Sequence, residues 1–102
     1  MKLNNHKLFI KENSVWARVA AKKMHSHALA MVLGKTIHLH NISREEFLND
    51  EQLLKHELCH VQQYRQHGYA GFLIKYLWES FRKGYYNNRF EVEARQAENE
   101  KV

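Results

Sequence analysis

The sequence predicts a small α+β domain, in which a short strand, a helix and a β-hairpin precede three helices. Apolar residues recur at helical spacing in several segments, they alternate with polar residues in one short segment, and glycines mark boundaries between segments. The chain has 102 residues, of which 44% are hydrophobic and 26% are charged, as in an ordinary globular domain. No proline-rich linker divides it, so we expect one domain over residues 1–102.

A strand and a helix begin this arrangement. Residues 7–11 form a short apolar run between polar residues, which is typical of a strand. Ser14 is a favourable N-cap for a helix over residues 15–24, because its hydroxyl can accept a hydrogen bond from a free backbone N–H.

A β-hairpin is expected next. Residues 28–33 are an apolar run, residues 36–40 alternate between polar and apolar, and Gly34 supplies the turn between them. The alternation places His38 and His40 on the same face of the second strand, where we expect both side chains to be solvated.

The longest amphipathic segment follows the hairpin. Its helix begins at Ser43 or Asn49 and ends at Gly68, a residue type that commonly terminates helices. The apolar stripe of this helix consists of Leu53, Leu54, Leu58, Val61 and Tyr64.

Two further helices complete the prediction. One covers residues 70–83 and ends at Gly84, and we expect its many aromatic residues to form the core against the preceding helix. Their breadth leaves a partner- or lipid-facing patch as the alternative. Asn87 or Asn88 then caps a last helix that extends to about residue 100.

Two histidines with metal-ligand spacing lie on the helix that ends at Gly68. In the segment His56-Glu57-Leu58-Cys59-His60, the imidazoles are four residues apart and therefore share one helix face. Two nitrogens placed in this way can bind one zinc ion at roughly 2.0–2.1 Å. Glu57 is turned by about 100° around the helix axis, so it can reach a water on the metal and act as a general base.

A catalytic zinc ion needs a third protein ligand, which must come from another segment. The last predicted helix offers Glu91 and Glu93, on faces about 200° apart. Each has a structural alternative, because Glu91 can complete a capping box with Asn88 and Glu93 can pair with Arg89 or Arg95 on the surface. The residues alone leave both candidates open.

The motif and its surroundings resemble a known group of metallopeptidases. The stretch His-Glu-Leu-Cys-His-Val-Gln-Gln at residues 56–63, preceded by Gly-Lys-Thr-Ile-His, is similar to minimal zincin-like domains of the glutamate-liganded (gluzincin) class. Among these it resembles small bacterial domains of uncharacterised function, and the likeness covers roughly residues 7–98. The resemblance implies a zinc-dependent metallopeptidase in which His56, His60 and Glu91 bind zinc. Glu57 would activate the zinc-bound water that attacks the peptide bond.

Two details of the resemblance bear on catalysis. Gluzincins have an aspartate four residues after the ligand glutamate, where it supports a ligand histidine, but this chain has Arg95, which cannot accept that hydrogen bond. The strand before the active-site helix is often a sheet edge that pairs with extended substrate, so the resemblance implies that residues 36–40 line the cleft.

Other polar residues are candidates for supporting roles. Peptidases of this type usually stabilise the developing oxyanion with a His, Tyr or Arg. The sequence offers His67, Tyr85, Tyr86 and Arg89 for this role. Cys59 is expected to be a free structural thiol and not a metal ligand.

The composition narrows the range of partners. The net charge is +5 and the pI about 9.4, but the basic residues are scattered and no groove-reading motif is present, so we expect no nucleic-acid partner. No segment has the length of a membrane span or a signal-peptide core, which predicts a cytoplasmic protein. The resemblance to metallopeptidases implies a peptide or protein substrate. The alternative is a catalytically weak or inactive zinc-binding interaction module, favoured by the small size and by Arg95.

Overall fold

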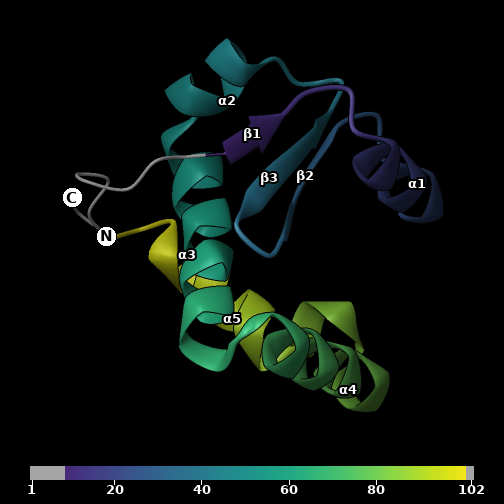
Figure 1. Ribbon diagram of the computed structural model, residues 1–102, viewed down its shortest axis with the longest axis vertical. Coiled ribbons are helices and arrows are strands. Elements are labelled where there is room, and N and C mark those ends of the chain that lie inside the picture. The colour runs from purple at the N-terminus through teal and green to yellow at the C-terminus, as the bar shows by residue number, and fades with distance from the viewer. Residues whose placement is uncertain (1–8, 101–102) are drawn as a thin grey trace.

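The computed structural model describes residues 9–100 and confirms the α+β class, with a three-stranded sheet and several helices (Figure 1). The elements in chain order are β1 Phe9–Lys11, α1 Val15–Lys23, β2 Leu29–Leu33, β3 Thr36–His40, α2 Arg44–Asn49, α3 Glu51–His67, α4 Tyr69–Asn87 and α5 Arg89–Ala97. The first two residues predicted for the opening strand, 7 and 8, lie outside the described residues.

The helical region after the hairpin divides at Asp50, so four helices follow the hairpin where three were expected. Ser43 begins α2 through a capping box with Glu46, which confirms one of the two expected starts. Asp50 has an extended backbone, with φ −94° and ψ 93°, and its carboxylate accepts a hydrogen bond from the backbone N–H of Leu53 at 3.1 Å. The other expected start, Asn49, is wrong because the neighbouring aspartate makes the cap of α3.

Gly84 interrupts α4 instead of ending it. Its φ of 81° is a conformation that glycine adopts at little steric cost, and one further helical stretch leads to Asn87. Asn88 then caps α5 by accepting a hydrogen bond from the backbone N–H of Phe90 at 2.9 Å, which confirms the second of the two expected caps. α5 ends at Ala97, before the expected end near residue 100.

The sheet has the strand order β1-β3-β2, so β3 is the central strand. β1 pairs with it in parallel and β2 pairs with it in antiparallel orientation. The expectation that residues 36–40 form a sheet edge is therefore wrong, because β1 occupies the side of β3 that a substrate would need. Within residues 9–100, β2 forms the edge on the other side of the sheet.

Helices α1 and α3 lie on opposite sides of the sheet (Figure 1). Ile37 and Leu39 point from β3 into the core that includes α3, and both are fully buried. On the opposite face, Nδ1 of His38 lies 2.7 Å from the hydroxyl of Ser14 at the beginning of α1. His38 is only 8% exposed and His40 is half-buried, so the expected solvation of the pair is wrong for His38. The core cluster comprises Val32, Ile37, Leu39, Phe47, Leu54, Leu58, Tyr64, Phe72 and Phe90.

Only one face of α4 contributes to this core. Phe72 is 2% exposed and Tyr76 packs against the same cluster. Trp78 and Phe81 are 59% and 83% exposed, so the expectation that all the aromatic residues of α4 form core is wrong for its outer face. Among the described helices, none has both the length and the apolar character needed to cross a membrane.

Candidate metal centre

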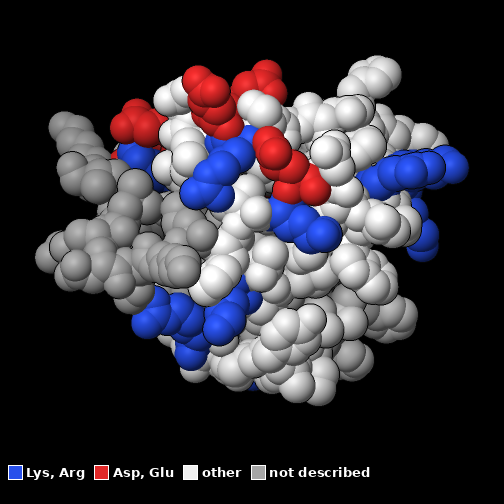
Figure 2. Space-filling model, turned by 45° about the horizontal axis from the view of Figure 1, so that its top comes forward, with Lys and Arg blue, Asp and Glu red and all other residues white. Residues whose placement is uncertain are grey.

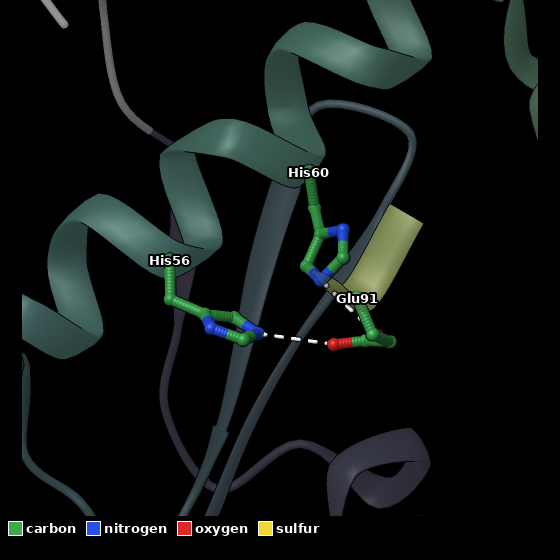
Figure 3. Close-up of side chains that lie close together, drawn as sticks. All are labelled: His56, His60 and Glu91. Carbon is green, nitrogen blue, oxygen red and sulfur yellow. Dashed lines mark hydrogen bonds and ion pairs between the residues drawn. The ribbon is translucent and has the colours of Figure 1, made fainter. Parts of the chain in front are cut away.

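Helix α3 carries two histidines toward the same point. Its apolar stripe, which includes Leu54 and Leu58, packs into the core and fixes the rotation of the helix. His56 and His60 are one turn apart, and their ring centroids are separated by 5.1 Å. Both rings turn their Nε2 atoms toward α5, as Figure 3 shows.

Glu91 meets these rings from the first turn of α5. One carboxylate oxygen lies 3.1 Å from Nε2 of His56, and the other lies 3.2 Å from Nε2 of His60 (Figure 3). The expected alternative, a capping box with Asn88, is not formed, because the backbone N–H of Asn88 donates to the carbonyl of Tyr85. The three side chains each offer one ligand atom, and these atoms all lie within 4.8 Å of one another. We call this group the metal centre.

Asn88 fixes the position of Glu91 relative to α4. Its side chain is fully buried, and its amide donates to the carbonyl of Tyr76 at 3.0 Å and to the hydroxyl of Ser80 at 2.8 Å. The same side chain caps α5 through its oxygen. Asn88 therefore joins the beginning of α5 to the middle of α4, and this contact aims Glu91 at the histidines.

In both histidines Nδ1 points away from Glu91, and we call it the outer nitrogen. The outer nitrogen of His60 is held by a buried amide. Nδ1 of His60 lies 2.8 Å from Oε1 of Gln63. The amide nitrogen of Gln63 donates to the carboxylate of Glu93 at 2.7 Å and to the carbonyl of Phe90 at 3.2 Å, so its oxygen must face the ring. Nδ1 therefore carries the proton, and Nε2 of neutral His60 presents a lone pair to the metal centre.

The outer nitrogen of His56 is held by a carboxylate. Nδ1 of His56 donates to Glu98 at 2.8 Å, because a carboxylate can only accept. The structure thus supplies the acceptor that Arg95 could not provide, since Arg95 donates to the carbonyl of Tyr86 at 2.6 Å. Glu98 stands seven residues after Glu91, which places both on one helix face, and this spacing is the signal that could have identified it.

The charges of the metal centre are strongly coupled. Burial alone would raise the pKa of Glu91, but its hydrogen bonds to His56 and His60 outweigh burial and hold the pKa well below its ordinary value. Burial lowers the pKa of both histidines, but the neighbouring carboxylates together outweigh burial and raise each pKa: Glu91 and Glu98 act on His56, and Glu91 and Glu57 act on His60. Without a cation, the carboxylate and the rings would compensate each other by protonation.

Glu57 is buried beside the metal centre without a partner. Its side chain is 3% exposed, and its Oε1 is a buried side-chain oxygen for which residues 9–100 provide no hydrogen-bond donor. Burial raises its pKa to about 8, although the nearby charge of His60 opposes this shift. A native protein rarely leaves a buried carboxylate oxygen unsatisfied, and such an atom marks a functional position or a missing ligand.

Two tyrosines of α4 also reach the carboxylate. The hydroxyl of Tyr76 donates to Glu91 at 2.5 Å. Burial, followed by the charge of Glu91, raises the pKa of Tyr76 and of Tyr85. Sequence reasoning assigned Tyr76 to the core alone, although a buried tyrosine hydroxyl usually requires a polar partner. Tyr85 is the residue among the oxyanion candidates that lines the cavity beside the metal centre.

The remaining candidate residues lie away from the metal centre. Glu93 accepts hydrogen bonds from Gln63, and the thiol of Cys59 lies 3.9 Å from it. Burial, and then the charge of Glu93, raises the pKa of Cys59 to about 12, so the thiol stays neutral. The other three oxyanion candidates make surface or ring contacts. His67 stacks on Phe72, Tyr86 lies under Arg95, and Arg89 covers Phe90.

A cavity of about 480 Å³ lies next to the metal centre. Its wall includes both histidines, Glu57 and Glu91, and much of the remaining wall is apolar. All residues of the edge strand β2 contribute to it, as do side chains from α1 and α4. The cavity therefore brings β2, an edge strand among residues 9–100, close to the polar residues of the metal centre.

The fold and the metal centre define a small α+β domain whose site is assembled from one His-Glu-x-x-His helix and a later glutamate. Residues 10–68 match the eCIS core domain (extracellular contractile injection system core), and the chain belongs to this family. The matched region includes His56, Glu57 and His60 but ends before Glu91. Neither a curated protein nor a solved structure matches the chain.

Proposed function

We propose that this chain is a zincin-like, zinc-dependent peptidase, in which His56, His60 and Glu91 bind the metal and Glu57 is the general base. The observation that carries the proposal is the convergence of two imidazole nitrogens and a carboxylate beside a buried carboxylate oxygen that lacks a partner. The resemblance of the sequence motif to gluzincins supports the same assignment.

The residues of the metal centre fit a zinc ion. Two Nε2 lone pairs and a carboxylate face one point, and such groups repel one another unless a proton or a cation lies between them. A set of two histidines and one glutamate is the donor set of a known type of catalytic zinc site, which leaves one coordination position open. Gln63 and Glu98 hold the outer ring nitrogens, which is the usual support for histidines that bind metals.

The proposed chemistry divides between the metal and Glu57. A bound zinc ion supplies a Lewis acid that polarises a carbonyl and lowers the pKa of water toward about 7. Glu57 takes a proton from the attacking water at its unpartnered Oε1 and passes it to the leaving amine. Because burial raises its pKa to about 8, Glu57 is well matched to proton transfer near neutral pH.

Two features of the cavity suggest how a peptide would be held. An extended substrate would pair with the free edge of β2, which replaces β3 as the candidate for this role. Tyr85 lines the same cavity, so its hydroxyl is the best-placed of the oxyanion candidates. Apolar wall residues would receive the side chains on either side of the scissile bond.

The decisive experiment combines metal content with peptide hydrolysis. The protein is purified without added metal, its zinc content is measured by mass spectrometry, and cleavage of an unstructured peptide library is followed after zinc addition. We expect one zinc ion per chain and measurable turnover. Glu57→Gln should keep the zinc and lose roughly 10²- to 10⁴-fold in kcat, the usual contribution of a general base.

Two other results would change the assignment. Zinc binding with no turnover on any library would favour the alternative, a zinc-binding interaction module, and reject the peptidase. Absence of zinc affinity in the wild type would reject both. Glu93→Gln is the matched control for Glu91→Gln, because both residues lie on α5 but only Glu91 faces the histidines. The control should retain more zinc affinity than Glu91→Gln does.

A further inference from the structure

The outer face of α4 is apolar and unpartnered among residues 9–100. Ile74, Leu77, Trp78 and Phe81 point away from the buried face of Phe72, and each is more than half exposed. The rings of Trp78 and Phe81 stack on each other, with centroids 6.1 Å apart. An apolar helix face is normally buried, so the outer face of α4 lacks a covering layer among residues 9–100.

Helix α1 shows the same feature on its outer side. Val15, Trp16 and Val19 are 67%, 64% and 51% exposed, while its alanines Ala17 and Ala21 face the protein. The chain has two tryptophans, Trp16 and Trp78, and both are mainly exposed. Burial of the large tryptophan side chain is strongly favourable. The exposure of both tryptophans therefore indicates a surface that binds a partner or a membrane.

The two helices border the same cavity. Ala20 and Lys23 of α1 contribute to its wall, as do Leu73 and Leu77 of α4. α1 lies on the opposite side of the sheet from α3, whereas α4 packs directly against α3, and both α1 and α4 lie at the right of the view in Figure 1. The exposed apolar residues of these two helices are Val15, Trp16 and Val19 of α1 and Ile74, Leu77, Trp78 and Phe81 of α4, and we call them the apolar flanks.

The charges beside the apolar flanks are basic. α1 carries Arg18, Lys22 and Lys23 and no acidic residue. α4 carries Lys75, Arg82 and Lys83, and its single acidic residue, Glu79, is buried and paired with Lys83 at 3.7 Å. On the face shown in Figure 2, the acidic side chains lie in the upper half, whereas the lower half shows only basic and uncharged side chains.

We infer that the apolar flanks dock on an anionic lipid surface, with the helices α1 and α4 lying in the headgroup region. Exposed tryptophan and phenylalanine with lysine and arginine alongside is the pattern of helices that lie in a membrane interface. A second copy of this chain is a poor occupant, because the cations of both copies would face each other. The inference does not depend on the proposed peptidase activity.

The test uses vesicles and the two native tryptophans. Addition of vesicles of phosphatidylcholine and phosphatidylglycerol should shift the tryptophan emission to shorter wavelength and sediment the protein, whereas pure phosphatidylcholine should bind much more weakly. The single variants Trp16→Phe and Trp78→Phe should each retain part of the shift, because one tryptophan lies on each flank. Lys75→Gln combined with Arg82→Gln should weaken binding about 30-fold, at roughly fivefold for each cation lost.

Matched variants separate the apolar and the charged contributions. Ile74→Ser combined with Phe81→Ser should reduce binding at least tenfold, while Leu48→Ser and Arg44→Gln on α2 should leave it unchanged. No emission shift with anionic vesicles would overturn the inference. Self-association in solution without lipid, abolished by the Ile74→Ser and Phe81→Ser pair, would also overturn it and assign the flanks to a protein interface.

Discussion

The interface between α3 and α5 and the outer surface of α4 depart in opposite directions from the usual distribution of side chains. The first region buries ionisable residues, including Glu57 at 3% exposure and Glu91 at 3%. The second region leaves Trp78 and Phe81 mostly in solvent. Both departures cost folding free energy, since buried carboxylates lose hydration and exposed rings order water.

The two costs differ in kind. In the metal centre, nearly every polar atom has a partner, and the exception is one oxygen of Glu57. A cation bound among these side chains would offset the free-energy cost of burying their carboxylates. On α4 the cost can only be offset from outside, by a surface that covers the rings. If the proposed zinc site and the inferred lipid surface hold, an ion completes the first region and an external partner completes the second.

The largest expected effect separates the two faces of α4. Phe72→Ala should destabilise the protein by about 3–5 kcal/mol, because it opens a cavity in the core. Phe81→Ala, nine residues further along the same helix, should change the free energy of unfolding by less than about 0.5 kcal/mol. Urea unfolding of both variants measures this difference. Similar losses in the two variants would show that Phe81 is packed in solution.

The next largest effect is expected when one histidine ring of the metal centre is removed. His60→Ala should lower zinc affinity by more than about 100-fold, which exceeds the loss expected from an outer-nitrogen partner. His67→Ala on the same helix is the control and should bind zinc like the wild type. Competition with a chromophoric chelator gives both affinities, and equal values would exclude His60 as a ligand.

The metal-free protein should become more stable when its unpartnered carboxylate is removed. Glu57→Leu replaces a buried polar group by an apolar side chain of similar size, and we expect a gain of about 1–3 kcal/mol in the presence of EDTA. The same variant should have no peptidase activity. Glu45→Leu on the exposed side of α2 should show no such gain. A destabilised Glu57→Leu protein would mean that Glu57 has a stabilising partner.

Gln63 and Glu98, the hydrogen-bond partners of the two outer ring nitrogens, should contribute unequally to zinc affinity. Gln63→Leu should reduce it by roughly 10- to 100-fold, because Gln63 is buried and no water can replace its oxygen. Glu98→Gln should have an effect near the lower end of that range, since its side chain is 30% exposed and still offers an acceptor. Gln62→Leu, on the exposed side of α3, is the control. Equal losses in both variants would contradict this ranking.

The smallest expected effect concerns a buried histidine outside the metal centre. Burial, and then the charge of Lys11 on the neighbouring strand, lowers the pKa of His38. The unfolded chain therefore binds more protons at this residue than the folded chain, so its contribution to stability is present above about pH 6.5 and is lost as the pH falls. The melting temperature should fall less between pH 7.5 and 5.5 in His38→Gln than in the wild type.

Local patterns in the sequence were sufficient for much of this structure. The spacing of His56 and His60, the cap at Ser43 and the turn at Gly34 each depend on neighbours within a few residues, and the structure places them as expected. The choice between Glu91 and Glu93 depended on resemblance, because only the rotation of α5 against α3 distinguishes their faces.

The unpredicted features depend on contacts between distant segments. The central position of β3 arises from parallel pairing with β1, across an intervening helix, and no local pattern encodes it. Glu98 holds the ring of His56 only because α5 docks at one particular angle, whereas Gln63 lies on the same helix as His60 and α5 only fixes the orientation of its amide. The exposed side of α4 is as apolar as its buried side, so the periodicity of the sequence does not distinguish the two.

The contact of Asn88 with α4 has a consequence for the order of events during folding. Glu91 follows His60 by a long stretch of chain, and in the folded chain it reaches the rings from the beginning of α5, which Asn88 joins to the middle of α4. A partly synthesised or frayed chain would hold two histidines and Glu57 without the third ligand. If the proposed zinc site and peptidase activity hold, tight zinc binding would report that the last helix has docked, and a newly made molecule would stay inert toward its neighbours until its fold was complete.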